Sequence, residues 1–175
     1  MKFKCICIFF ALCSFFSCAT NNLPPLKTVA KVDLNRYLGL WYEIARFDQN
    51  FQKGCVATTA EYSLKNEDKI RVINRCRIDS IDGKEKMAEG TAWVVDKESN
   101  AKLKVTFFWP FSGNYWIIDL DANYQYAVVG EPERNYLWIL SRTPKMDQST
   151  YDAIISRLVD QKYDITKLKK YPQKN

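Results

Sequence analysis

Gly39-Leu40-Trp41-Tyr42-Glu43-Ile44-Ala45-Arg46-Phe47 is the stretch that decides the fold of this 175-residue chain. It opens with a glycine, which adopts backbone torsions that other residues resist. Aromatic and β-branched residues follow closely, as is typical of a β-strand. Far along the chain comes Tyr136-Leu137-Trp138-Ile139-Leu140-Ser141-Arg142-Thr143-Pro144, which we interpret as a strand that ends at an arginine just before a proline.

Six further strand-length segments lie between these two stretches, separated by short links rich in polar residues, glycine and proline. The predicted strands cover residues 40–47, 56–64, 70–78, 89–96, 103–109, 115–120, 125–130 and 136–142. Eight strands with short links are typical of an antiparallel sandwich or an up-and-down barrel.

One amphipathic helix is predicted after the last strand, where Asp147 or Ser149 can cap its first turn. Its apolar stripe consists of Tyr151, Ile154, Ile155, Leu158 and Val159. A helix with a single apolar face should pack on the outside of the β structure. Beyond it we expect a short edge strand at 163–168 and a loose tail at 171–175.

The first eighteen residues differ in composition from the rest. Lys2 and Lys4 precede an apolar run that ends at Phe16 and is shorter than the roughly 20 residues that span a bilayer. This pattern predicts a signal peptide over residues 1–18. The small residue before Cys18 resembles the lipidation site of bacterial lipoproteins, with Cys18 as the lipidated first mature residue; plain secretion is the alternative. Residues 19–31 then form a tether to a folded domain at 32–170.

The folded part keeps only two of the six cysteines, Cys55 and Cys76. An exported protein with two cysteines is expected to pair them. Counting outward from the polar hairpin loop at 65–69 places them opposite one another to within about a residue, which is close enough for a disulfide.

The chain contains no histidine. This excludes Ser-His-Asp and Cys-His catalysis, histidine zinc sites and histidine-ligated haem. With both cysteines oxidised, thiolate chemistry is excluded as well. We therefore predict no enzyme, no cofactor and no metal site. The formal net charge of +6 is spread along the chain, which disfavours nucleic-acid binding because that needs a concentrated basic stripe.

The Gly-x-Trp of residues 39–41, together with the arginine that closes the last strand, resembles the signature of the lipocalins. The longer sequence of residues 41–47 resembles that of their bacterial lipoprotein and apolipoprotein D branch. The resemblance covers residues 32–168 and rests also on Tyr62-Ser63-Leu64, Val72-Ile73-Asn74 and the Phe-Phe-Trp-Pro-Phe run at 107–111. It implies an eight-stranded up-and-down barrel with one α-helix packed outside, in an outer-membrane protein of the bacterial envelope.

An eight-stranded barrel is wide enough to hold one small ligand. The positions that line the pocket in apolipoprotein D-like lipocalins match Tyr62, Phe107, Trp138 and Leu140. Alternation along the strands gives Val56, Thr58, Ala60, Tyr62 and Leu64 one shared face, and Ile70, Val72, Asn74 and Cys76 another. We predict that Asn74 is the polar contact to a ligand headgroup; the alternative is that these residues are simply core.

The resemblance implies a carrier of a fatty acid or lysophospholipid, with a role in envelope lipid maintenance. Two alternatives stay open: an enzyme acting on lipid on the same fold, and an envelope interaction protein whose barrel is filled. Neither the oligomeric state nor the exact ligand follows from the sequence.

Three further expectations concern single sites. Trp41 should be a structural plug, with Arg142 lying across its ring as a cation–π contact. Glu43 should form an ion pair with an arginine rather than act as an acid or base. The aromatic residues at 107–111, with Tyr115 and Trp116, predict an apolar rim at the open mouth that contacts a bilayer, the alternative being ordinary β-packing.

Overall fold

The computed structural model describes residues 23–174, so the predicted signal peptide and Cys18 lie outside the described residues. The helical elements are α1 (Leu34–Tyr37), η1 (Asn50–Gln52), α2 (Gln148–Asp160) and η2 (Ile165–Lys167). The strands are β1 (Gly39–Phe47), β2 (Cys55–Asn66), β3 (Lys69–Ile78), β4 (Glu85–Val94), β5 (Lys102–Phe108), β6 (Phe111–Leu120), β7 (Tyr126–Gly130), β8 (Leu137–Ser141) and β9 (Leu168–Lys170).

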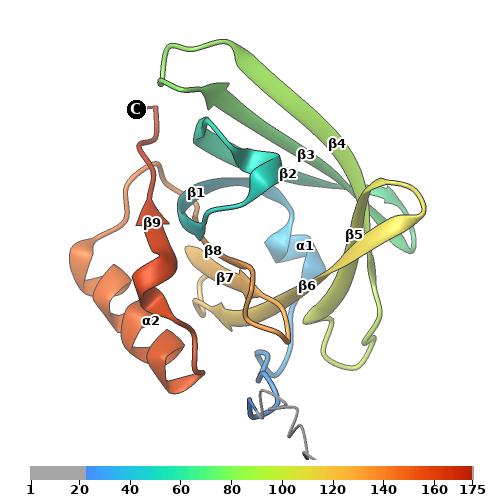
Figure 1. Ribbon diagram of the computed structural model, residues 1–175. Coiled ribbons are helices and arrows are strands. Elements are labelled where there is room, and N and C mark those ends of the chain that lie inside the picture. Colours follow the sequence, from blue (N-terminus) through green and yellow to red (C-terminus); the bar gives the residue numbers. More distant parts are fainter. Residues whose placement is uncertain (1–22, 175) are drawn as a thin grey trace, which may run out of the picture.

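The strands β1 to β8 form a closed antiparallel barrel, and α2 packs on its outside, as predicted (Figure 1). Each strand pairs with the next, and β1 pairs with both β2 and β8, which closes the sheet. In such a meander the β1–β2, β3–β4, β5–β6 and β7–β8 links all lie at one end. We call this the open end; the other, which holds α1, is the closed end. No helix among residues 23–174 is long and apolar enough to cross a membrane.

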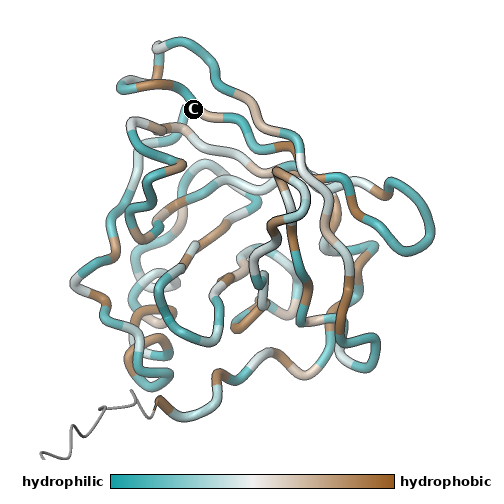
Figure 2. The backbone as a smooth tube through the Cα atoms, turned by 45° about the vertical axis from the view of Figure 1, so that its right-hand side comes forward, coloured by the Kyte–Doolittle hydropathy of each residue, from teal (hydrophilic) through white to brown (hydrophobic). Residues whose placement is uncertain are grey.

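Two apolar cores flank the barrel wall. The interior core contains Trp41, Tyr62 and Leu140, and the outer core packs α2, through Ile154 and Leu158, against the sheet. Figure 2 shows the corresponding pattern along the strands, where apolar stretches alternate with polar ones. This alternation is expected because one face of the barrel wall is buried in the interior and the other faces outward.

A bulge in β1 interrupts the alternation at one place. Glu43 lies opposite Leu140, and Ala45 lies opposite Ile139, so Ile44 is the extra residue. Ile44 and Ala45 both belong to the outer core as a result. The bulge therefore turns Glu43 and Arg46, three residues apart, to the same inner face.

A second bulge, in β2, corrects part of the predicted alternation. Ala57 has a φ of +48°, and the pairing register shifts between Val56 and Thr59. Val56 consequently lies opposite Arg77 on the outer face. Cys55 lies opposite Ile78, two residues from Cys76, so the predicted placement to within about a residue is wrong. The predicted disulfide forms nevertheless, with the two Cα atoms 5.4 Å apart. Leu64, which was expected inside, is exposed near the β2–β3 hairpin.

The prediction of a loose tail is wrong, and the predicted edge strand is displaced. η2 occupies residues 165–167, and β9 follows at 168–170, paired with the second half of β1. The Tyr171 N–H then donates to Ile44 O on β1, and Pro172 O accepts from Ala57 N–H on β2. The Gln173 side chain donates to Glu43 O and Thr58 O, at 2.6 and 3.1 Å. Because β1 pairs with β2 only over residues 39–42, this tail completes the wall where the two strands diverge.

Candidate functional site

The closed end is sealed by Trp41, which is fully buried. Its indole Nε1 donates to Tyr37 O at 2.8 Å, and the Arg142 Cζ lies 3.7 Å from the ring centroid, as predicted. Gly39 supplies the entry to this strand with a φ of +95°, a torsion that other residues rarely adopt. Arg142 donates to Arg36 O at 2.7 Å, a carbonyl group at the end of α1, and to Leu40 O of β1 at 2.9 Å.

Three tyrosine hydroxyls meet just above this plug. Tyr115 Oη lies 2.7 Å from Tyr37 Oη and 2.9 Å from Tyr62 Oη. Burial raises the pKa of Tyr62 to about 12 and raises the pKa values of Tyr37 and Tyr115 as well, so all three stay neutral. The cavity that these rings share with apolar walls is about 10 Å³, room for about one water. This tyrosine cluster is therefore the floor of the barrel interior.

The structure gathers the predicted pocket residues in one interior. Tyr62 and Leu140 are buried members of the interior core, and Phe107 and Trp138 pack against it while only partly buried. Phe107 lies flat against β4, because Gly90 has no side chain there; a Cβ would come within 2.8 Å of the ring. Since the closed end is sealed, solvent reaches these partly exposed side chains from the open end.

Asn74 lies on the inner face of β3, as predicted. Its cross-strand neighbours are Ala60 on β2 and Ala88 on β4. Asn74 Oδ1 is buried and has no hydrogen-bond partner among the described residues. A buried amide oxygen without a partner costs free energy unless a bound molecule or water satisfies it.

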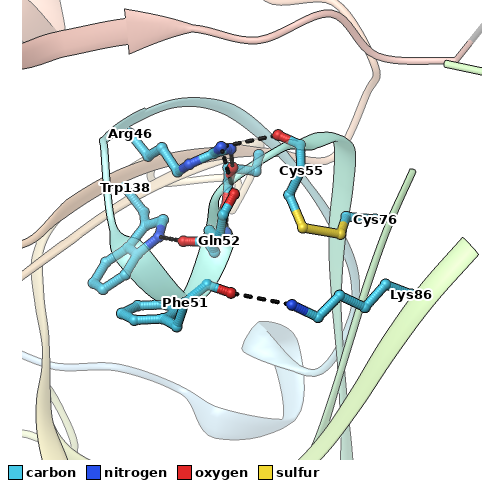
Figure 3. The surroundings of a disulfide bond; sticks show 8 residues. Arg46, Phe51, Gln52, Cys55, Cys76, Lys86 and Trp138 are labelled. Carbon is cyan, nitrogen blue, oxygen red and sulfur yellow. Dashed lines mark hydrogen bonds and ion pairs between the residues drawn. A yellow bond between two sulfur atoms is a disulfide. The ribbon is translucent and has the colours of Figure 1, made fainter. Parts of the chain in front are cut away.

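A buried polar network lies between the pocket and η1 (Figure 3). Arg46 Nη1 donates to the Glu43 carboxylate, which confirms the expected ion pair, and Arg46 Nη2 donates to Cys55 O at 2.9 Å. Gln52 connects this pair to the pocket: its Nε2 donates to Glu43 Oε2 at 2.9 Å, and its Oε1 accepts from Trp138 Nε1 at 3.0 Å. Burial raises the pKa of Glu43, and Arg46 opposes that rise.

Lys86 is a cation that the sequence analysis did not single out. It lies opposite Cys76, on the inner face of β4 and two residues nearer the open end than Ala88, which is opposite Asn74. Its Nζ donates to Phe51 O at 3.4 Å across the opening (Figure 3). Alternation from the buried Ala92 through Gly90 would have placed it inside. The Asn74 amide and, nearer the open end, the Lys86 ammonium group thus lie in succession on the inner face.

The predicted aromatic rim is only partly present. Phe108, Trp109 and Phe111 are 80, 85 and 77% exposed at the β5–β6 link. Tyr115 and Trp116, which were predicted with them, are not: Tyr115 points its hydroxyl into the tyrosine cluster, and Trp116 packs against the outer core beside Lys102. The alternation of β6 separates these two residues onto opposite faces of the wall.

Chemically, this interior can bind an apolar chain and a polar or anionic group. Within residues 23–174 no three Cys, Asp or Glu side chains cluster as metal ligands would.

The family model for the lipocalin-like domain matches residues 32–173. Temperature-induced lipocalin-1 of Arabidopsis thaliana is 41% identical over 157 residues, which cover 85% of this chain and 83% of that protein. The outer membrane lipoprotein Blc of Vibrio cholerae is 40% identical over 163 residues, covering 92% and 95%. The structure of insecticyanin from the tobacco hornworm Manduca sexta superposes with a TM-score of 0.69 at 20% identity, covering 87% of this chain and 86% of that one. The chain belongs to the lipocalin family, in the branch that includes the bacterial outer-membrane lipoproteins.

Proposed function

We propose that this protein is an outer-membrane lipoprotein of the bacterial envelope that binds and carries a small amphipathic lipid, a fatty acid or a lysophospholipid. The observation that carries the proposal is the buried, unpartnered Asn74 Oδ1 on the inner face of β3, beside an apolar interior core against which the partly exposed Phe107 and Trp138 pack. The relatives named outer membrane lipoprotein support the location. Lipidation of Cys18 and a role in envelope lipid maintenance belong to the same proposal.

In this proposal an acyl chain lies among Phe107, Trp138 and Leu140, and the ring of Tyr62 forms its floor. Each buried CH₂ group contributes about 0.8 kcal/mol. The headgroup lies toward the open end, where Asn74 and then Lys86 follow one another on the inner face. The amide supplies a hydrogen bond, and the ammonium group favours an anionic carboxylate or phosphate.

Native mass spectrometry of protein purified without detergent tests the carrier function. A co-purified lipid, together with displacement of a fluorescent fatty-acid analogue by palmitate, is the expected result. Repeated absence of both would favour the interaction protein with a filled barrel. Turnover of lysolipid esters would instead favour the enzyme, which the lack of histidine argues against.

Removing the ammonium group at the opening should weaken anionic ligands selectively. We expect Lys86→Ala to lower the affinity for palmitate about threefold to tenfold at low salt, since one charge-assisted contact is lost. Asn74→Leu should cost a similar factor at any salt concentration. Lys104→Ala removes the same charge from the outer face of β5 and is the matched control. Equal losses in the Lys86 and Lys104 variants would contradict this placement of the headgroup.

A further inference from the structure

The open end of the barrel carries an unusual amount of exposed apolar surface. At the β5–β6 link, Phe108, Trp109 and Phe111 are each at least 77% exposed. We call these three residues the mouth aromatics. Large apolar side chains gathered on a surface mark a contact with another protein or with a membrane.

Apolar side chains also lie beside the other three links of this end. Their exposed fractions are 59% for Phe51, 39% for Ile81, 58% for Met87 and 38% for Tyr136. Phe51, Tyr136 and Trp138 stack in sequence, with ring centroids 6.3 and 5.9 Å apart, so the apolar surface runs from the rim into the pocket. With the mouth aromatics, it surrounds the opening.

The N-terminal segment begins at the same end. Pro24 O accepts from Arg134 Nη2 at 2.6 Å, and Arg134 lies in the β7–β8 link at the open end. The segment then follows the wall, where Val29 N–H donates to Ile117 O, and reaches the closed end, where Val32 N–H donates to Ser99 O. Leu23, the first described residue, therefore lies beside the mouth. Cys18 is five residues earlier, a distance of at most about 18 Å.

From these observations we infer that the open end docks on a lipid bilayer, with the mouth aromatics in the interfacial region and the opening facing the membrane. Aromatic side chains favour that region because one part is apolar and the wet headgroups are close by. A bilayer is preferred over a second copy as the occupant because the described chain begins on this side, five residues after the predicted anchor Cys18. The inference holds whatever cargo the barrel takes.

The charges at this end indicate what kind of docking to expect. The open-end links carry Asp48, Asp79, Asp82, Glu131 and Glu133 against Lys53, Lys84 and Arg134. Lys86 adds a cation at the opening, and Lys169 pairs with Asp48, so neither sign is in excess and an anionic membrane gains no net attraction. Docking is therefore apolar, should occur on zwitterionic lipid, and should resist salt.

The test uses a chain that starts at residue 19, which lacks the predicted anchor but keeps every described residue. Flotation with phosphatidylcholine vesicles should carry it upward, equally in 0.1 M and 1 M salt. The double variant Trp109→Ser, Phe111→Ser should bind at least tenfold more weakly. Its control is Leu64→Ser, Val95→Ser, which removes two apolar residues, 58 and 49% exposed, at the closed end.

Several outcomes would overturn the inference. Failure of the wild type to float would overturn it, as would an equal loss of binding in the control and the mouth variant, or loss of binding in high salt. A dimer that the mouth variant converts to monomer, without vesicle binding by the wild type, would assign the rim to a second copy instead. Displacement of the fluorescent fatty acid in solution, without vesicles, should be equal in all three proteins, so that failure of docking and failure of cargo binding are separate results.

Discussion

The two ends of the barrel differ in how their side chains are buried and hydrogen-bonded. At the closed end Trp41 is fully buried, its N–H is paired, and Arg142 donates to carbonyl groups of α1 and β1. Toward the open end, Arg46 Nε, Thr58 Oγ1 and Asn74 Oδ1 are buried without a hydrogen-bond partner among the described residues. Large apolar rings there face solvent instead. The comparison indicates that the closed end maintains the fold, and that the open end retains groups that a bound molecule or surface would satisfy.

The largest expected effect comes from removing the plug. Trp41→Ala should lower the free energy of unfolding by about 3–5 kcal/mol, because it empties a fully buried site and removes the contact with Arg142. Trp109→Ala, at 85% exposure, should change it by less than about 0.5 kcal/mol. Urea denaturation measures both. An unchanged midpoint for Trp41→Ala would remove the distinction between the ends.

The C-terminal tail gives an intermediate effect. Ending the chain after Lys170 removes the hydrogen bonds that Tyr171, Pro172 and Gln173 make to β1 and β2. We expect a loss of about 2–3 kcal/mol, since each such bond contributes about 0.5–1.5 kcal/mol. Ending the chain after Gln173 is the matched control. Hydrogen exchange should show faster exchange at Ala57 but not at Trp41; faster exchange at both would mean that the two ends unfold together.

The buried ion pair should give the smallest effect when both partners are replaced together. Burial raises the pKa of Glu43 above its ordinary value, so ionised Glu43 costs free energy that its partner only partly offsets. The double variant Glu43→Met, Arg46→Met should therefore change the free energy of unfolding by less than about 1 kcal/mol, whereas Glu43→Gln alone leaves the buried Arg46 charge unpaired and should lower it by about 3–5 kcal/mol near neutral pH.

The difference in stability between the wild type and Glu43→Gln should depend on pH, and the direction of that dependence is defined. A carboxyl group with a raised pKa in the folded state contributes stability that is fully present below its unfolded pKa of about 4.3 and is lost as the pH rises through the raised value. The wild type should therefore gain stability relative to Glu43→Gln on acidification from neutral pH toward 4. Denaturation of both proteins at several pH values measures this, and a relative loss on acidification would show that the pKa is lowered instead.

The sequence predicts the barrel well because its periodicities are local. Alternating strands, polar links and the stripe of α2 each depend on neighbours in the chain, and Trp41 with Arg142 is a recognisable pair. Bulges are not visible in such patterns. One extra residue in β1 turns Arg46 inward, and one in β2 moves Val56 outward. The residue types at these positions do not indicate either bulge.

Contacts between distant segments were equally hard to predict. Tyr115 looked like part of an aromatic surface run, yet its hydroxyl joins Tyr37 and Tyr62 inside. The basic tail looked unstructured because its composition is polar, but it lies where β1 and β2 part, and unpaired strand groups there need partners.

The path of the N-terminal segment has a mechanical consequence. Residues 23–31 lie along the wall, held by the burial of Leu26 in the outer core and by the hydrogen bonds of Arg134 with Pro24 O and of Val29 with Ile117 O. A pull from the N-terminal side would load these contacts before any strand pairing in the barrel. If these contacts were released, the N-terminal segment could extend by up to about 30 Å. In the proposed lipid-anchored protein, the same segment would set two distances between the anchor and the barrel: a short one with these contacts intact, and a long one after their release.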